Sequence, residues 1–415
     1  MSQNQETISK RLYLFFTAAV TDVGGGQIYI RRKLIYLRQC GYTPIVFSFS
    51  YGKFYIDELK EFDACIIPEL RYPISAFTKH HQDKIKKKIK TFFPLHTDSI
   101  VIESHEYVTA SWGESLAKDV NGKHVVYLLS ETPWLMPEEF KPFFLMKYKR
   151  NELFFITPAV AQSFMQNFMD IEEFNPENFA LSARCGTSVE NVAEDHLGIV
   201  YEKDAITICS IGRLEKPFVY PMCCDLLEYV KSKPEKKFVV IFVGGSKLKQ
   251  NVKQIKTLFT NVKNCRIFIT GFVYPIPESI LQKSDVCISS AGSVGMAARY
   301  GIPSISIDSV DYKPIGVMNF TTQNTLKRDK EEIRPLADWL QEILIDKKYP
   351  KNFHSQEMIE IDYADHLKVI NDIDKLYFDV AQIKCPKRLI FKAWLLSVLK
   401  CKKLIFKIRS LYIKV

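Results

Sequence analysis

The sequence has 415 residues, of which 47% are hydrophobic and 25% charged, a globular composition and a length that suits two or three domains. No basic-then-apolar leader opens the sequence and its first apolar run, residues 12–20, is too short to span a bilayer, so we expect a cytoplasmic protein. The ten cysteines form no CxxC pair and no histidine is spaced with them as in a zinc site, which predicts reduced core thiols and no metal.

The net charge of +10 is concentrated at the end of the chain. Residues 380–415 contain ten Lys and Arg and no acidic residue, so the rest of the chain is neutral. This asymmetry predicts an anionic partner for the tail and argues against a nucleic-acid-binding body.

Short apolar runs alternate with stretches of helical length in the first half of the chain. We expect strands at the following positions: "LYLFFT" (12–17), "TPIVFSF" (43–49), "SIVIES" (99–104), "HVVYLLS" (124–130) and "LFFIT" (153–157). Continuous apolar strands that alternate with helices are typical of a doubly wound parallel sheet. The sequence therefore predicts a Rossmann-like domain over residues 1–186.

The alternation weakens in the polar stretch 187–204, which we interpret as an interdomain linker, and then resumes. The second set of expected strands is "AITICSIG" (205–212), "KKFVVIFVGG" (236–245), "CRIFITG" (265–271), "DVCISS" (285–290) and "PSISID" (303–308). These runs predict a second Rossmann-like domain over 205–354. A closing helical segment over 355–383 and a basic tail over 384–415 follow.

A glycine-rich loop follows the first expected strand, where a strand turns into a helix. Gly24, Gly25 and Gly26 would let the backbone approach a ligand, and the helix start offers free N–H groups to a phosphate or sugar oxygen. The spacing is not GxGxxG and no acidic residue ends the second strand, which disfavours a nicotinamide site. A tight turn without a ligand is the alternative.

Chemically suitable residues also follow four strands of the second domain, at the edge where open α/β sheets bind ligands. Arg213 and Lys216 could hold a diphosphate, although solvated surface cations are the alternative. A nucleobase could lie along the loop of Phe272 and Val273. The small-residue turn near Gly292 leads into a helix expected from Val294 with Ser293 as N-cap, which would cradle a pyrophosphate. Gly244 and Gly245 lie at the end of the expected strand 236–245.

The order of "GGG", "IGRLEK", "GFV" and "SDVCISSAGSVGMAARYGIP" resembles the retaining glycosyltransferases of the GT-B fold, especially family 4. The loop "SAGSVG" is also similar to that of the lipid-linked N-acetylglucosamine transferases of peptidoglycan synthesis. The resemblance covers most of residues 10–380. It implies two Rossmann-like domains facing across a cleft, with the carboxyl-terminal domain binding a nucleotide diphosphate sugar without a metal. It assigns the donor diphosphate to Arg213 and, with shifted spacing, Lys216, and the sugar and phosphates to the glycine loop.

The sequence departs from this family at two places. The glutamate that holds the donor ribose is replaced by Met296, and the histidine loop after the fourth strand reads "LLSETPW", which offers Glu131. Glu131 is one catalytic candidate, with a capping or solvated carboxylate as the alternative, and His105 in "IESHEY" is the second. These departures leave two other functions open: a GT-B-like protein that binds a nucleotide or partner without transfer, and a sugar-nucleotide 2-epimerase.

The tail 384–415 has the pattern of an amphipathic helix. On a helical wheel Lys392, Lys400, Lys403, Lys407 and Lys414 share one arc, and Trp394 lies on the apolar side opposite them. This layout favours a helix in an anionic membrane interface, with packing of the apolar stripe on the protein's own surface as the alternative. Together with the resemblance, it predicts a peripheral enzyme on the inner face of the plasma membrane that acts on a lipid-linked or oligosaccharide acceptor in polysaccharide or glycolipid assembly.

Overall fold

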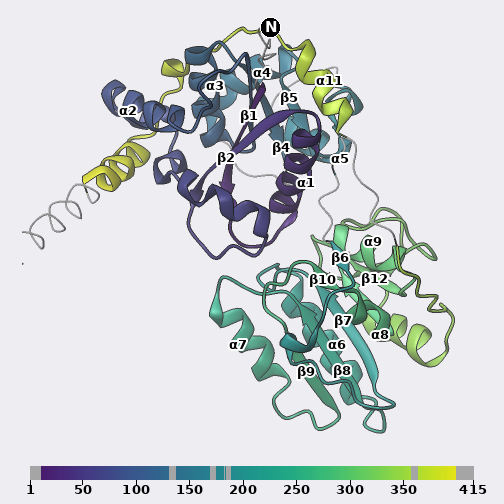
Figure 1. Ribbon diagram of the computed structural model, residues 1–415. Coiled ribbons are helices and arrows are strands. Elements are labelled where there is room, and N and C mark those ends of the chain that lie inside the picture. Colours follow the sequence, from purple (N-terminus) through teal and green to yellow (C-terminus); the bar gives the residue numbers. More distant parts are fainter. Residues whose placement is uncertain are drawn as a thin grey trace, which may run out of the picture. The chain divides into compact units, whose positions relative to one another are not determined.

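The computed structural model describes residues 11–129, 137–168, 174–181, 183, 188–356 and 363–398. The chain forms two compact units (Figure 1). The first, unit 1, consists of residues 1–22, 29–184 and 361–415, and the second, unit 2, consists of residues 23–28 and 185–360.

Unit 1 is built on a five-stranded sheet with the order β2-β1-β3-β4-β5, in which every neighbouring pair is parallel. Its strands are β1 (Arg11–Ala19), β2 (Tyr42–Ser50), β3 (Ser99–Ser104), β4 (Lys123–Leu128) and β5 (Leu153–Phe155). Its α-helices are α1 (Gly25–Gln39), α2 (Lys79–Lys90), α3 (Tyr107–Val120), α4 (Lys141–Lys149), α5 (Pro158–Phe168) and α11 (Ala364–Asp372). Short 3₁₀ turns join them: η1 (Asp57–Cys65), η2 (Pro68–Arg71), η3 (Ile74–Ala76), η4 (Glu138–Phe140), η5 (Pro176–Phe179) and η8 (Val380–Gln382).

Unit 2 contains a six-stranded sheet with the order β13-β12-β11-β7-β8-β9, parallel except for β13. The strands are β7 (Ile206–Ile211), β8 (Phe238–Val243), β9 (Cys265–Ile269), β11 (Val286–Ser289), β12 (Ser304–Ile307) and β13 (Pro314–Val317). Its helical elements are α6 (Val219–Lys231), α7 (Lys249–Leu258), α8 (Glu278–Lys283), α9 (Gly292–Arg299), α10 (Leu336–Leu340), the π-helical turn η7 (Gln341–Ile345) and the 3₁₀ turn η6 (Asp195–Leu197).

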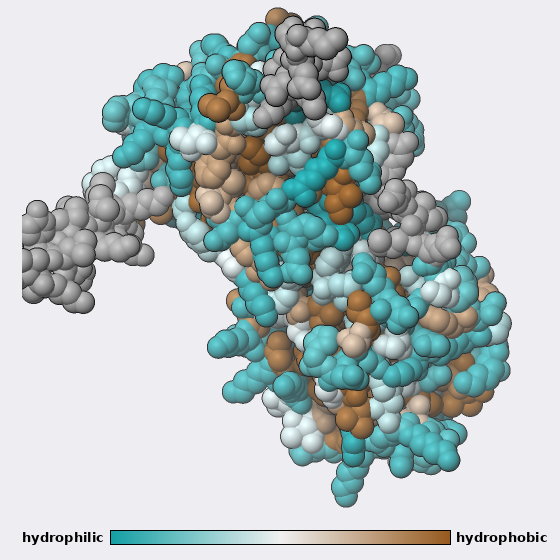
Figure 2. Space-filling model, in the orientation of Figure 1, coloured by the Kyte–Doolittle hydropathy of each residue, from teal (hydrophilic) through white to brown (hydrophobic). Residues whose placement is uncertain are grey.

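Alternation along the strands of unit 2 shows why both faces of its sheet are covered. Ile208 and Val240 pack into one cluster, with α6 and α10, whereas Cys209 and Ile241 pack into another, with α8 and α9. Successive side chains of a strand point to opposite faces, so a strand that is apolar at every position needs helices on both sides. Hydrophilic residues in turn cover much of the outer surface in view, between smaller hydrophobic patches (Figure 2).

After unit 2 the chain returns to unit 1, where buried polar contacts hold the returning segment. The backbone N–H of Phe378 donates to Glu114 Oε1 at 2.6 Å, and Lys123 Nζ donates to the carbonyl of Ile370 at 3.1 Å. Glu114 also accepts from Lys147 and His124, both at 2.6 Å. These bonds attach residues 363–383 to unit 1, with Tyr363, His366, Ile370, Ile373 and Ile383 buried.

The prediction of two Rossmann-like domains is confirmed, with local differences. The stretch predicted as a linker, 187–204, includes β6 (Val189–Glu190), which pairs with β10 (Ile276–Pro277) in a small sheet of unit 2. In the described part of the closing segment, α11 is followed by residues without regular secondary structure and by the turn η8. Residues 387–398 of the tail are helical, and the rest of the tail lies outside the described residues. No helix in the described part of the chain is long and apolar enough to cross a membrane.

Candidate functional site

The strand order of unit 2 defines a switch point between β11 and β7. From β7 the chain proceeds outward through β8 and β9, and it later returns to the other side of β7 as β11 and β12. Ligands of open α/β sheets bind outside the carboxyl ends of the strands at such a point. The loop of Arg213 follows β7 and the start of α9 follows β11, so the predicted donor residues flank this position.

The loop after β7 presents two cations and a carboxylate. The Arg213 side chain is exposed and lies 3.5 Å from Glu215, measured from Nη1 to Oε1. Lys216 is half-buried, with its Nζ 5.8 Å from the centre of the Phe218 ring. Glu215 Oε2 is buried and has no hydrogen-bond partner in the described part of the chain. Sequence reasoning missed Glu215, whose position between the two cations is its only sequence signal.

Gly244 and Gly245 keep the neighbouring loops in contact. Gly244 has a φ of 157°, and a Cβ there would overlap the carbonyl oxygen of Gly212, while a Cβ on Gly245 would come within 3.0 Å of the Phe272 backbone nitrogen. Leu214 N–H donates to the carbonyl of Gly245 at 2.9 Å. Both glycines are buried, so they shape the site and bring the Arg213 loop next to the loop of Phe272 and Val273, whose side chains are half-buried.

The start of α9 differs from the prediction. Ala291, with a φ of 58°, is the N-cap residue and makes no side-chain cap bond, and the helix begins at Gly292. The prediction that Ser293 caps a helix beginning at Val294 is therefore wrong by two residues, because the chain already turns into the helix at Ala291, with a positive φ. Gly292 is exposed and Ser293 half-buried, whereas the Val294 side chain is fully buried and leaves only its backbone N–H for a ligand.

Met296 is a core residue. Its side chain is 3% exposed and packs in the cluster of Cys209 and Ile211 on the α8 and α9 side of the sheet. A glutamate at this position would place its carboxyl in the apolar core, which argues against a contact from here to a ribose.

Unit 1 has its own switch point, between β1 and β3. Gly24, Gly25 and Gly26 follow β1, and α1 begins at Gly25; these glycines fall in residues 23–28, which are grouped with unit 2. Glu106 follows β3, where its Oε1 accepts from the backbone N–H of Ala18 at 3.0 Å and its Oε2 from the Thr109 hydroxyl at 3.0 Å. Burial raises the pKa of this half-buried carboxyl. Glu106 is a second residue that sequence reasoning missed, although it follows His105 directly.

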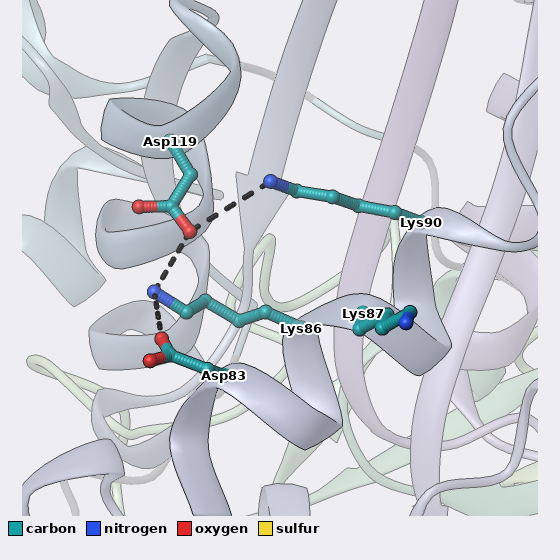
Figure 3. A pocket seen from close by; sticks show the side chains of 5 residues that line it. All are labelled: Asp83, Lys86, Lys87, Lys90 and Asp119. Atoms are coloured by element: carbon teal, nitrogen blue, oxygen red, sulfur yellow. Dashed lines mark ion pairs between the residues drawn. The ribbon is translucent and has the colours of Figure 1, made fainter. Parts of the chain in front are cut away.

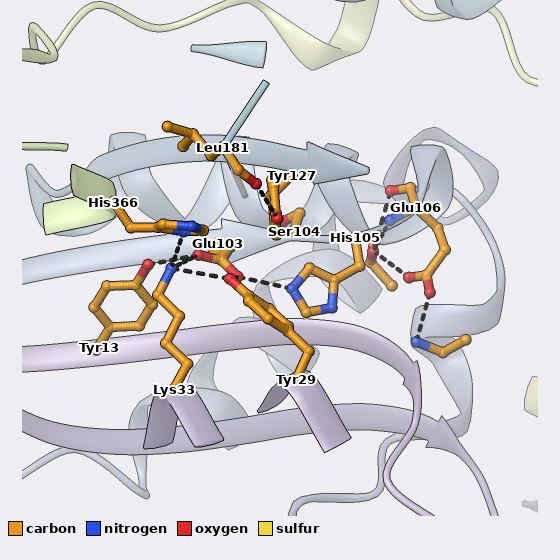
Figure 4. Close-up of polar contacts among 12 residues, drawn as sticks. Tyr13, Tyr29, Lys33, Glu103, Ser104, His105, Glu106, Tyr127, Leu181 and His366 are labelled. Atoms are coloured by element: carbon orange, nitrogen blue, oxygen red, sulfur yellow. Dashed lines mark hydrogen bonds and ion pairs between the residues drawn. The ribbon is translucent and has the colours of Figure 1, made fainter. Parts of the chain in front are cut away.

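His105 does not face solvent. It is 4% exposed, and its Nε2 lies 2.9 Å from Glu103 Oε1 within a buried network (Figure 4). Glu103 also accepts from Tyr13 at 2.6 Å and Tyr29 at 2.8 Å. Glu103 therefore holds the His105 ring in the core of unit 1, and the proposed catalytic role of His105 stays a prediction.

A lysine and a second histidine complete this network from two helices. Lys33 Nζ of α1 lies 2.5 Å from Glu103 Oε2 and 3.2 Å from His366 Nδ1 of α11. Burial alone would raise the pKa of Glu103, but Lys33 and His105 hold it well below its usual range. The network ties the returning helix α11 to the first helix and the sheet.

Glu131 lies outside the described residues, so its role stays a prediction. No group of three or more His, Cys, Asp and Glu side chains is placed to hold a metal ion within the described ranges. A pocket on unit 1 is lined by Asp83, Lys86, Lys87 and Lys90 of α2 and by Asp119 of α3 (Figure 3). Lys86 pairs there with Asp119 at 2.8 Å and Asp83 at 3.5 Å, so we assign this pocket no ligand.

No protein-family model matches the sequence, and no curated protein matches it. Solved structures match it in fold. A glycosyltransferase from Rickettsia africae is 17% identical, with a TM-score of 0.52 over 93% of this chain and 97% of that one. Anabaena HepE in complex with UDP-glucose is 13% identical, with a TM-score of 0.54 over 81% and 91%. OtsA is 13% identical, with a TM-score of 0.50 over 90% and 97%.

These likenesses span nearly the whole of each matched chain and place the protein in the GT-B fold of glycosyltransferases. The fold predicted from the order of the sequence motifs is thereby confirmed. At these identities the likeness concerns the fold alone.

Proposed function

We propose that the protein is a glycosyltransferase that moves a sugar from a nucleotide diphosphate sugar to a hydroxyl acceptor. The observation that carries the proposal is the convergence of four loops at the carboxyl edge of the unit 2 sheet, with Arg213 and the start of α9 on either side of the switch point. The complexes of HepE with UDP and UDP-glucose support this type of donor.

Each loop has a role in holding the donor. Arg213 and Lys216 bind the diphosphate, and the backbone N–H groups of Gly292, Ser293 and Val294 bind it from the other side. The loop of Phe272 and Val273 accepts the nucleobase. Glu215, whose buried oxygen has no partner among the described residues, accepts a hydroxyl of the ribose in place of the glutamate that the sequence lacks at Met296.

Transfer breaks the bond between the sugar anomeric carbon and the diphosphate oxygen, and the acceptor oxygen forms a new bond to that carbon. Negative charge develops on the leaving diphosphate, where Arg213, Lys216 and the α9 N–H groups stabilise it without a metal. The acceptor hydroxyl loses its proton, for which Glu106 and Glu131 are the candidate acceptors. We propose a hexosyltransferase with retention of configuration, as the motif resemblance implies.

We further propose that the acceptor is a lipid-linked saccharide or oligosaccharide in polysaccharide or glycolipid assembly, used at the inner face of the plasma membrane. The support is the cluster of ten cations in residues 380–415.

A panel of nucleotides and nucleotide sugars tests this proposal. A true donor at a hundred times its dissociation constant should stabilise the protein by about 2.7 kcal/mol in thermal unfolding, and release of free nucleoside diphosphate should follow when an acceptor extract is added. Binding without release would favour the non-catalytic alternative, and release of an epimerised free sugar would favour the epimerase. No stabilisation by any nucleotide would contradict the proposal.

A further inference from the structure

The helix at residues 387–398 exposes large apolar side chains on unit 1. Phe391 is 60% and Trp394 is 57% exposed, with Ile390 and Leu395 beside them on the same outward side. The rings of Phe391 and Trp394 contact one another, with centroids 5.9 Å apart. These four adjacent hydrophobic residues form an exposed apolar patch on one face of the helix, and such a patch is typical of an interaction site.

This outward face is a second apolar face of the helix, because the inward face is already used. Ala393 is fully buried, and Leu389 and Leu396 are half-buried on the same side. Ile383, just before the helix, is 1% exposed and belongs to the core cluster of Phe143 and Phe155. The helix is therefore anchored by one face while the other stays available.

The exposed cations of this segment lie among the exposed apolar residues. Lys384, Lys387, Arg388 and Lys392 are all exposed, and no acidic residue follows Asp379. At 100° per residue Lys387 falls between Trp394 and Phe391, and Arg388 falls next to Leu395. In the predicted layout Lys392 lies opposite Trp394, and the spacing within the helix agrees with this. Lys387 and Arg388, which were not part of that arc, share the outward face with the exposed rings, and the other lysines of the arc lie outside the described residues.

We propose that the outward face of residues 387–398, hereafter the anchor face, binds the surface of an anionic lipid bilayer, with Phe391 and Trp394 entering the interface and the surrounding cations contacting the headgroups. Aromatic rings with Lys and Arg beside them suit the boundary between headgroups and acyl chains. This inference deepens the proposed function, since it names the surface that brings the enzyme to a membrane-borne acceptor.

The charge of the anchor face distinguishes an anionic lipid bilayer from two other possible partners, a second copy of the chain and a soluble anion. A second copy of the chain would bring an identical row of cations against this one, which is unfavourable at close range. A soluble anion would satisfy the cations but leave the Phe391 and Trp394 rings in water. An anionic bilayer satisfies both parts of the anchor face.

Co-sedimentation of the full-length chain with vesicles tests the proposal. We expect binding to phosphatidylcholine vesicles that contain phosphatidylglycerol, and little binding to phosphatidylcholine alone. Phe391→Ser with Trp394→Ser should weaken the binding by about tenfold or more, and Lys387→Gln with Arg388→Gln and Lys392→Gln should weaken it by a similar factor. Trp394 emission should shift to the blue on binding in the wild type.

Matched variants on unit 2 provide the controls. Val310→Ser with Phe320→Ser removes two equally exposed apolar side chains, and Lys249→Gln with Lys253→Gln and Lys256→Gln removes three exposed cations from α7. Both should bind vesicles like the wild type. A truncated variant that lacks the anchor face should end at Pro386, because removing Ile383 as well would open the core.

Equal vesicle binding by the anchor-face variants and the control variants would overturn the proposal. Cation-dependent binding of the wild type to heparin, together with normal vesicle binding by the Phe391 and Trp394 variant, would also overturn it. A change of oligomeric state in that variant, with vesicle binding intact, would instead assign the anchor face to a second copy. Nucleotide-induced thermal stabilisation should be unchanged in every variant, so failure here is distinguishable from failure of the proposed function.

Discussion

The two units share a fold class but stabilise it differently. Among the described residues, unit 1 buries several charged groups in two networks, one around Glu103 and one around Glu114. In the described part of unit 2 a single charged side chain, Asp308, is buried, and it accepts from the backbone N–H groups of Val310 and Arg328. Unit 2 thus has an apolar core and places its polar chemistry at the strand ends.

The two units therefore use charged residues for different purposes. A buried ion pair contributes little net stability but is costly to break, so the networks of unit 1 make the docking of α11 and residues 373–383 specific. Unit 2 keeps Arg213 exposed and its loops close together through glycines, which suits the binding of a phosphorylated ligand. The predictions below test this division, in order of decreasing free-energy effect.

Glu103→Gln should have the largest effect. It leaves the Lys33 ammonium buried without a counter-charge, which costs about 3–5 kcal/mol. Urea unfolding of the full chain measures the loss, and hydrogen exchange should show α11 opening first. Glu61→Gln is the matched control, because Glu61 pairs with Arg38 where both side chains are more than 40% exposed, and it should cost less than about 1 kcal/mol. Similar losses in both variants would show that the buried network has no special role.

Met296→Glu should destabilise unit 2 by about 3 kcal/mol, because it replaces a buried thioether with a carboxyl that has no partner in the core. Met296→Leu keeps the volume and should cost less than about 1.5 kcal/mol. Thermal unfolding measures both. If the glutamate variant were fully stable and bound the nucleotide more tightly than the wild type, residue 296 would contact the ribose, which would contradict its placement in the core.

Acidification should weaken unit 1 before unit 2. Burial and Lys147 lower the pKa of His124 to about 4, and Lys147 and His124 lower that of Glu114 to about 2 against the effect of burial. Both folded-state values lie below the unfolded ones, so the unfolded state takes up protons first and stability falls as pH drops from about 6.5 towards 2.

The His124 shift corresponds to about 3 kcal/mol. Hydrogen exchange corrected for intrinsic rates should show α3 and β4 losing protection between pH 7 and 4.5, while β7 and β8 change little, because the two described histidines of unit 2, His196 and His354, are exposed. His124→Gln should flatten this dependence. Equal loss in both units would contradict the comparison.

Arg213→Ala with Lys216→Ala should reduce kcat/KM for sugar transfer by about 100-fold, or 2.7 kcal/mol, with unfolding unchanged. The control pair is Lys236→Ala with Lys237→Ala, two exposed cations at the opposite, amino-terminal edge of β8, which should keep wild-type turnover. Undiminished transfer in the Arg213 and Lys216 variant would remove both residues from the donor site.

Glu215→Gln should have the smallest effect, a loss of about tenfold in nucleotide affinity, because the amide accepts a ribose hydroxyl less well than a carboxylate does. Titration calorimetry with a nucleoside diphosphate measures it, and Glu228→Gln on the exposed side of α6 is the control. If the nucleotide affinity of the Glu215→Gln variant were unchanged, Glu215 would interact with Arg213 but not with the nucleotide.

The sequence predicted the fold well because continuous apolar strands between helices leave few alternatives. It did not predict the Glu103 network, since Lys33 and Glu103 have the sequence pattern of surface residues and only the topology brings them together. The start of α9 was misplaced because the positive φ of Ala291 leaves no sequence signal. Glu106 and Glu215 were missed because a carboxylate at a strand end usually caps a helix or is solvated, and only the sheet order shows that both lie at switch points.

Hydrogen exchange of the full chain with and without a stabilising nucleoside diphosphate tests the donor site most directly. The nucleotide should slow exchange at residues 212–216, 244–245, 271–273 and 291–294, and the protection should disappear in the Arg213→Ala and Lys216→Ala variant. Protection confined to other strand ends, or none at these loops when the nucleotide is shown to bind, would contradict the assignment of the donor to the carboxyl edge of unit 2.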